Sequence, residues 1–349
     1  MDSVIVVGGG VIGTAVAEHL ARVGHPVTLL ERDQLGSKAS GGAAGLLAPH
    51  SESAHPPAFT DLARRSHSLF PELANRLAKD TLVDVEFRAL ESLRLATSDL
   101  ELALLDQHQS GFGQAHRLDA SQCRELEPGL GSDVCAGLLF QESQVSPLRL
   151  VTALARSAIE HGAEIREGTP VEAPVASGGV VTGVRTPAGV LNADWVVLAA
   201  GPWTGLLASA LGLAVDVAPR RGQLVTLAPR RRELSRILTA GTSYAVPKPD
   251  GTVVLGSTEE EAGFDARPTV AGVARILGLA TAWLPALANA TVQAAWAGLR
   301  PVTSTGMPII GPDPDYPNLI VATGHHRNGI LLAPITAEIV ARGLGGGWA

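Results

Sequence analysis

The N-terminal segment up to Glu31 constrains the fold more than any other part of the sequence. An apolar run of strand length, SVIVV, leads into GGGVIG, in which Gly8, Gly10 and Gly13 form a Gly-x-Gly-x-x-Gly motif. Apolar residues at helical spacing follow as far as Gly24, and a second apolar run ends in Glu31. This strand–helix–strand pattern with a terminal acid predicts a Rossmann-like dinucleotide-binding unit.

Each residue of the motif has a physical role in such a unit. Gly8 allows the tight turn, Gly10 lets the backbone approach a pyrophosphate, and Gly13 lets the helix pack closely on the sheet. The helix N-terminus then faces the negative charge of the pyrophosphate. Glu31 is expected to accept a hydrogen bond from a ribose hydroxyl, and its carboxylate would repel a 2′-phosphate. The pattern therefore disfavours NADP.

The next segment distinguishes between dinucleotides. ASGGAAGLLAPHSE, from Ala39 to Glu52, is small, glycine-rich and apolar, so it can lie flat against a large cofactor. A typical NAD domain would continue here with a helix and a parallel strand. A flexible linker is the alternative, but it fits poorly with the apolar run AAGLL at residues 43–47.

Composition excludes several classes of protein. The chain has 349 residues, 46% hydrophobic residues and a formal net charge of −7, which fits a globular protein and argues against a nucleic-acid partner. Its two cysteines, with no cluster of Cys and His, predict neither a disulfide framework nor a metal site and are typical of the cytoplasm. The N-terminus lacks the features of a signal peptide, and no apolar run is long enough to predict a membrane span.

The remaining sequence predicts an α/β fold of mixed type with two domains. After Pro147 we expect an amphipathic helix, a strand at residues 163–166, a small antiparallel meander and the buried strand WVVLAAG. Longer strands such as RGQLVTLAP predict a second domain with a mixed sheet. We assign residues 1–83, 144–215 and 298–349 to the cofactor domain, and residues 84–143 and 216–297 to the substrate domain.

One arginine stands out in the otherwise small and apolar segment WAGLRPVTSTGMPIIG, from Trp296 to Gly311. An arginine is rarely buried without a partner, so Arg300 is expected to meet a negatively charged group. An ion pair with an acidic side chain of this chain is the structural alternative to a ligand.

Five segments occur in an order that resembles a known family: GGGVIG, GAAGLLAP, YAVPKPDGTVVLGST, WAGLRPVTSTGMPIIG and GHHRNGILLAP. Together they resemble the FAD-dependent amine oxidases of the D-amino-acid oxidase superfamily, and most closely the glycine oxidases of thiamine biosynthesis. The resemblance extends over nearly the whole chain, and GHHRNGILLAP is its most specific part.

The resemblance implies an FAD domain and a substrate domain whose sheet covers the flavin. It implies hydride transfer from the carbon next to the substrate nitrogen to flavin N5, hydrolysis of the imine, and reoxidation by O2 to give H2O2. Glycine would become glyoxylate and ammonia. Neither Cys123 nor Cys135 lies in the C-terminal motifs where related sarcosine oxidases attach FAD, so non-covalent FAD is expected. The family also implies a homotetramer.

Three catalytic residues carry over from the family. Arg300 matches the arginine that holds the substrate carboxylate in a bidentate fork. Tyr244 matches a tyrosine whose hydroxyl assists carboxylate binding, although a packing aromatic would also fit. Arg327 is expected next to substrate and flavin, where its charge would stabilise the reduced, anionic flavin.

Further cofactor-binding positions also follow from the resemblance, in addition to the glycine motif. The final helix, opened by Asn328 and Gly329, would point its positive end at flavin O2. The predicted FAD contacts are Val11, Ile12, Glu31, Arg32, Ala39, Ser40, Ala44, Gly45, Leu46, Val171, Gly201, His325, His326, Arg327, Asn328, Gly329, Ile330 and Leu331.

The chain departs from the family at two places. Thr305-Gly306 stands where the family commonly has Asp-Gly. Glu259 follows GST, where glycine oxidases can place an apolar pocket residue. We therefore include Glu259 among the expected substrate contacts, since an acid near the substrate nitrogen would change amine preference or pH dependence.

Three alternatives remain open from sequence. Within the same superfamily the enzyme could be a sarcosine, D-proline or D-alanine oxidase, or a dehydrogenase with another acceptor, because sequence does not give the pocket width. An NAD-dependent dehydrogenase is a second alternative, although GAAGLLAP and HHRNG weigh against it. A non-enzymatic nucleotide-binding protein is the third.

Overall fold

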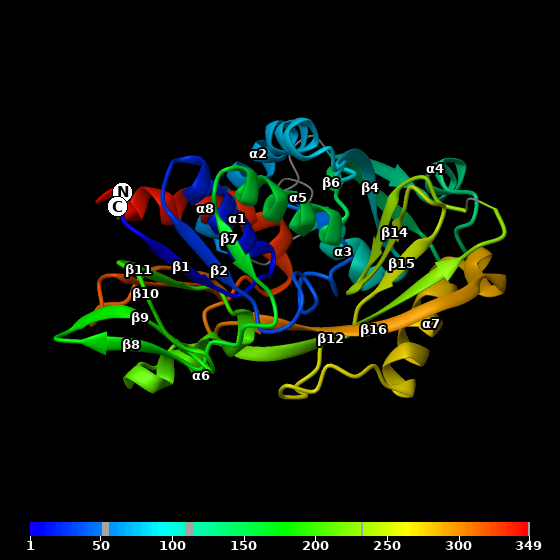
Figure 1. Ribbon diagram of the computed structural model, residues 1–349. Helices are drawn as coiled ribbons and strands as arrows, with labels where there is room; N and C mark the ends of the chain where they lie inside the picture. Colours follow the sequence, from blue (N-terminus) through cyan, green and yellow to red (C-terminus); the bar gives the residue numbers. More distant parts are fainter. Residues whose placement is uncertain (51–55, 109–114, 232, 348–349) are drawn as a thin grey trace.

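The computed structural model describes residues 1–50, 56–108, 115–231 and 233–347, which form two large β-sheets flanked by helices (Figure 1). The first sheet has six strands in the order β17-β18-β11-β1-β2-β7, parallel except for β17. Its strands are β1 (Val4–Val7), β2 (Val27–Leu30), β7 (Glu164–Arg166), β11 (Trp195–Leu198), β17 (Ile309–Pro312) and β18 (Leu319–Thr323).

Alternation along the strands distributes side chains to two faces of the first sheet. Val4 and Val6 of β1 lie in a core with four helices, whereas Ile5 and Val7 lie in a second core with the meander. The helices are α1 (Val11–Arg22), α2 (Pro57–Thr81), α5 (Pro147–Glu160) and α8 (Gly329–Leu344). The meander comprises β8 (Ala173–Ser177), β9 (Val180–Thr186) and β10 (Gly189–Asn192), in the expected antiparallel arrangement.

The second sheet has nine strands and is mixed, as expected from sequence. Its main order is β16-β12-β15-β14-β13-β4-β6-β3, and β5 pairs with β6. The strands are β3 (Leu46–Leu47), β4 (Arg88–Ala96), β5 (His116–Asp119), β6 (Ala136–Gln144), β12 (Ala218–Ala228), β13 (Ile237–Ala240), β14 (Ser243–Pro247), β15 (Val253–Gly256) and β16 (Thr291–Val302). The other α-helices are α3 (Asp99–His108), α4 (Ala120–Leu126), α6 (Thr204–Ala208) and α7 (Val270–Trp283).

The long strands β12 and β16 run side by side beneath both halves of the molecule (Figure 1). β16 continues to Val302, so the second sheet extends past the boundary that we place after residue 297. The short strand β3 also pairs with β6 of the second sheet, although it lies in the segment assigned to the cofactor domain. The second sheet therefore includes residues of both predicted domains, at β3 and at the end of β16.

The long helix α2 is a feature that the motifs do not predict. It begins with Pro57 at its first turn, where the missing N–H costs nothing, and ends before Leu82 in a left-handed conformation. Phe59, Phe70 and Leu77 of α2 are buried in the same core as α1 and α8. In the described part of the chain, no helix is both long and apolar enough to cross a membrane.

The close packing of the first turn generates a testable prediction. A Cβ at Gly13 would lie 1.9 Å from the carbonyl oxygen of Gly8, so Gly13→Ala must displace either the helix or the turn. We expect a loss of unfolding free energy of roughly 1–3 kcal/mol or more, measured by urea denaturation.

Gly278→Ala is the matched control for this change. Gly278 lies in α7, and a Cβ there would have no neighbour within 4 Å, so alanine should be neutral or stabilise the helix by up to about 1 kcal/mol. Equal stability of Gly13→Ala and the wild type would contradict the proposed role of Gly13.

Candidate functional site

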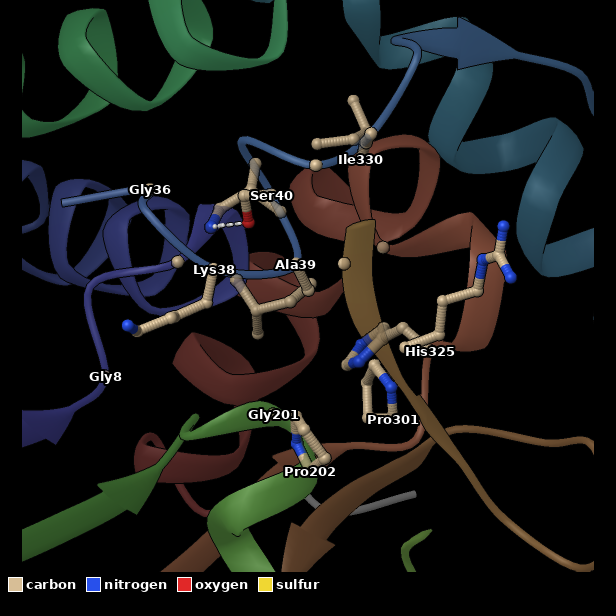
Figure 2. Close-up of a pocket in the computed structure, with 18 of the residues that line it drawn as sticks. Gly8, Gly36, Lys38, Ala39, Ser40, Gly201, Pro202, Pro301, His325 and Ile330 are labelled. Atoms are coloured by element: carbon tan, nitrogen blue, oxygen red, sulfur yellow. Dashed lines mark hydrogen bonds between the residues drawn. The ribbon is translucent and has the colours of Figure 1, made fainter. Parts of the chain in front are cut away.

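A cavity of about 380 Å³ lies where the first sheet meets β12 and β16, within the size range of ligand pockets. Figure 2 shows its lining: Lys38 and Ser40 lie on one side, Gly201 and Pro202 below, and Pro301 and His325 opposite. The sequence-predicted residues that line it are Gly8, Gly10, Val11, Ile12, Glu31, Arg32, Ala39, Ser40, Ala44, Gly45, Leu46, Val171, Gly201, Tyr244, Arg300, His325, His326, Arg327, Asn328, Gly329 and Ile330.

Gly13, Glu259 and Leu331 are the other predicted residues, and they do not belong to the lining of this cavity. Gly13 lies behind the turn against Gly8, which agrees with the packing role expected of it. Leu331 is buried in the core of the helical layer. Glu259 is half exposed, with a carboxylate oxygen 3.6 Å from Nε2 of His326, which does line the cavity.

The glycine turn brings backbone to the cavity wall. Gly8 has φ +110°, and a Cβ there would lie 2.6 Å from the carbonyl oxygen of Ala199 on the neighbouring strand end. Gly10 precedes α1, and the hydroxyl of Ser40 accepts a hydrogen bond from the N–H of Val11 (2.9 Å). The first turn of a helix presents N–H groups that lack intrahelical partners, so this end of the cavity suits an anion.

Glu31 follows directly after β2 and is nearly buried. One carboxylate oxygen accepts from the N–H of Gly9 (2.7 Å) and the other from the N–H of Asp33 (2.8 Å). These two bonds orient the carboxylate, and each oxygen has a second lone pair for a ligand hydroxyl. An acid oriented in this way can accept a hydrogen bond from the hydroxyl of a bound ribose.

Positively charged side chains surround the same end of the cavity. The guanidinium of Arg32 lies 4.9 Å from the ring centroid of Trp203, a cation–π contact between two lining residues. Lys38 and Arg32 both pair with Asp33, and hydrogen bonds from them lower the pKa of that carboxyl. Trp203 was not predicted from sequence, although its neighbour Gly201 is one of the predicted FAD contacts.

The segment from Ala39 to Leu46 lines the cavity and packs closely against β16. A Cβ on Gly42 would lie 3.1 Å from Cα of Gly298 on β16, and the indole of Trp296 donates to the Gly42 carbonyl (3.2 Å). Residues 51–52, which end the stretch considered above, lie outside the described residues.

A lysine that sequence reasoning missed also holds this segment. The ammonium of Lys248, just after β14, donates to the carbonyl of Ala44 and to Oε1 of Gln144 (3.3 Å). Burial lowers the pKa of Lys248 to about 8, opposed by the charges of Glu86 and Asp250. No local signal pointed to Lys248, because both partners come from distant segments of the chain.

Arg300 lies on β16 with its guanidinium against the backbone of β12. Its Nη1 donates to the carbonyl of Thr258 (3.0 Å) and its Nη2 to the hydroxyl of Ser257 (2.8 Å). A Cβ at Gly222 would lie 2.3 Å from Cζ, Nη1 and Nη2, so only glycine leaves room for the guanidinium. The plane of Arg300 is therefore fixed at the cavity wall.

Tyr244 lies on β14, and a glycine on the neighbouring strand likewise leaves room for its side chain. A Cβ at Gly256 of β15 would lie 2.3 Å from Cζ and 2.4 Å from the hydroxyl of Tyr244. The tyrosine is almost buried, and it lines the cavity together with Arg300 and Ser257. Sequence reasoning missed Gly222, Gly256 and Ser257, because spacing does not show which strands become neighbours.

The C-terminal motif closes the cavity between β18 and α8. His325 is buried and Arg327 is exposed, and both line the cavity. His326 has φ +51°, a left-handed conformation that is uncommon for residues other than glycine. Asn328 is the N-cap of α8, and its amide Nδ2 is buried without a hydrogen-bond partner among the described residues.

A family model described as FAD dependent oxidoreductase matches residues 3–342, so the chain belongs to this family. The glycine oxidase of Geobacillus kaustophilus is 35% identical over 346 residues, covering 97% of this chain and 91% of that protein. A crystal structure of glycine oxidase from Geobacillus kaustophilus has a TM-score of 0.96 to this fold at 33% identity, and covers 100% of this chain and 95% of its own.

Two further relatives extend the comparison. The bifunctional protein ThiO/ThiG of Trichormus variabilis is 36% identical over 344 residues, covering 97% of this chain and 52% of that protein, so the chain spans about half its length. The crystal structure of iminodiacetate oxidase from Chelativorans sp. BNC1 has a TM-score of 0.92 at 26% identity, and covers 99% of this chain and 96% of its own.

The residues present fit FAD on observations independent of these relatives. The glycine turn and the first turn of α1 offer N–H groups for a pyrophosphate, and Glu31 offers an oriented carboxylate for a ribose. At the other end, the buried amide Nδ2 of Asn328 has no partner among the described residues and lies in the lining, where a polar ligand atom would satisfy it.

The buried lysine predicts a pH-dependent stability. Because the pKa of Lys248 falls from 10.5 to about 8 on folding, the unfolded chain binds a proton between these values that the folded chain does not. The free energy of unfolding should therefore rise with pH through this window. Titration of Lys248 should raise the free energy of unfolding by about 2 kcal/mol between pH 8 and pH 10.

Lys248→Met removes the titrating group and serves as the reference. Urea denaturation at pH 8 and pH 10 should show the wild type gaining stability relative to the variant at the higher pH. A difference between the two proteins that stays constant over this range would show that the pKa of Lys248 is not lowered.

Proposed function

We propose that the protein is an FAD-dependent glycine oxidase that deaminates glycine and small amino acids such as sarcosine and D-amino acids. Glycine would give glyoxylate, ammonia and H2O2, with O2 as the acceptor. The similarity to a glycine oxidase and to ThiO/ThiG supports this substrate class and a role in thiazole formation for thiamine biosynthesis.

The observation that carries the proposal is the position of Arg300. Its guanidinium lies flat in the space left by Gly222, and Thr258 and Ser257 fix its plane. A guanidinium held in this way at a cavity wall matches the planar, bidentate geometry of a carboxylate. Tyr244 lines the same part of the cavity and supplies a hydroxyl.

The chemistry follows from the positions of the protein groups. FAD, when bound, accepts the hydride from the substrate carbon. Arg300 and Tyr244 bind the carboxylate and so orient the carbon and the amine toward the cofactor. Arg327 places a positive charge at the cavity, where it favours the reduced, anionic form of a flavin.

An N-substituted glycine is the second candidate substrate. The similarity to iminodiacetate oxidase supports it, since iminodiacetate is a glycine with a further carboxymethyl group on nitrogen. Glu259 lies beside His326 but outside the lining of the cavity, so its charge does not favour either candidate.

The central experiment mixes the purified protein anaerobically with glycine, sarcosine, D-alanine, D-proline and iminodiacetate, and follows flavin bleaching. Glycine should bleach the wild type. Arg300→Ala should raise the dissociation constant for glycine by roughly 100-fold or more, because two charge-assisted hydrogen bonds are lost. Arg300→Lys should restore only part of this affinity, since lysine lacks the fork.

Arg342→Ala, an exposed change near the end of α8, controls for charge alone and should bind glycine as the wild type does. If iminodiacetate or sarcosine bleaches the flavin and glycine does not, the second candidate is correct. If none of these amines bleaches a flavin that is present, the proposed substrate class is wrong.

Gly222→Ala tests the support of Arg300 without changing any charged residue. The new Cβ would occupy the position of the guanidinium, so glycine affinity should fall at least tenfold while FAD remains bound. Gly311→Ala is the control, since a Cβ there meets nothing within 4 Å. Unchanged glycine binding in Gly222→Ala would contradict the role assigned to Arg300.

We also propose that FAD is held without a covalent bond, because Cys123 and Cys135 both lie outside the lining of the cavity. Release of FAD from acid-precipitated protein tests this. The division into cofactor and substrate domains also stays a prediction. The homotetramer stays a prediction, and sedimentation velocity would test it.

A further inference from the structure

A buried hydroxyl lies behind the imidazole of His325. Nε2 of His325 lies 3.0 Å from Oγ1 of Thr336, about two helical turns into α8. The same hydroxyl donates to the carbonyl of Leu332 at 2.8 Å. Thr336 has no exposed surface and His325 is 2% exposed, so water does not compete for these bonds.

The hydroxyl determines which nitrogen of His325 carries the proton. Thr336 has a single hydroxyl hydrogen, and the Leu332 carbonyl, which can only accept, takes it. The hydroxyl oxygen must then accept from Nε2, so Nε2 carries a hydrogen. Burial lowers the pKa of His325 to about 3, so the ring is neutral near pH 7 and Nδ1 carries a lone pair.

Nδ1 has no hydrogen-bond partner among the residues that the structure describes, and the ring lies in the lining of the cavity beside Pro301 (Figure 2). Pro301 has no N–H to offer, and the nearby N–H of Asn328 donates to the backbone carbonyl of His325 instead (2.9 Å). Because this unpaired nitrogen belongs to a side chain that lines the cavity, a ligand that fills the cavity can supply a donor to it.

We propose that Thr336 is a positioning residue that holds His325 as the Nε2–H tautomer, so that Nδ1 accepts a hydrogen bond from a hydroxyl or N–H group of bound FAD. The proposal rests on FAD occupying this cavity. It separates two roles within one motif: His325 recognises the cofactor as a neutral acceptor, and Arg327 supplies the positive charge.

The tautomer is measured directly by NMR on protein labelled with 15N-histidine, with His325→Gln used to assign the signals of His325 among the ten histidines. In the apoprotein, His325 should be neutral with the proton on Nε2. Added FAD should shift the Nδ1 resonance in the direction of an accepted hydrogen bond. A proton on Nδ1, or no change at Nδ1 with FAD, would overturn the proposal.

A matched pair of variants tests the role of the hydroxyl. Thr336→Val keeps the shape of the side chain and removes the acceptor, whereas Thr336→Ser keeps the hydroxyl. Thr336→Val should show a mixture of tautomers and bind FAD about tenfold more weakly, measured by fluorescence titration of the apoprotein. Thr336→Ser should resemble the wild type. Equal FAD affinity in the two variants would contradict the proposal.

His325→Gln provides an independent test if Thr336→Val does not fold. Glutamine can place an N–H near the position of Nε2 and so keep the bond to Thr336, but it has no acceptor at the position of Nδ1. FAD affinity should fall about tenfold, with the melting temperature of the apoprotein near that of the wild type. Unchanged FAD affinity would show that Nδ1 does not bind the cofactor. None of these measurements requires a substrate, so they remain informative if the proposed amine is wrong.

Discussion

The structure depends most on the close approach of the segment 39–46 to β16. Gly42 and Gly298 meet backbone to backbone, and the indole of Trp296 donates to the carbonyl of Gly42. A Cβ at Gly42 would lie 3.1 Å from Cα of Gly298, so a larger side chain there would push the segment away from β16. This contact, together with the bond from Lys248 to Ala44, holds the strand that carries Arg300 against the cofactor side of the molecule. Gly42 and Gly298 both line the cavity, so this close contact forms part of its wall.

Glycine also makes room for the functional side chains of the second sheet. The guanidinium of Arg300 occupies the place of a side chain at Gly222, and the ring of Tyr244 occupies the corresponding place at Gly256. Both groups therefore lie flat on the sheet, in positions set by strand register and not by their own flexible bonds. Such placement restricts a long side chain to few rotamers, which is the preorganisation that substrate binding and orientation require.

Much of the site could be predicted because it is local in sequence. Gly8, Gly13 and Glu31 lie within one strand–helix–strand unit, whose geometry follows from spacing alone. Lys248 could not be predicted in the same way, since its partners Ala44 and Gln144 come from two other segments of the chain. The expected substrate contact Glu259 illustrates a further limit: its sequence position is next to the site, but its side chain lies outside the cavity lining.

The sequence by itself determined the cofactor half of the protein, because a glycine turn, a helix start and a following acid interact over short distances along the chain. It also indicated Arg300, since an arginine in a small apolar segment requires a partner. Only the tertiary structure decided what surrounds that arginine. Gly222 and Ser257 reach it through the pairing of β16 with β12 and of β12 with β15. The proton on His325 likewise depends on Thr336, because a hydrogen bond between a loop and the buried face of a helix is invisible until both are packed.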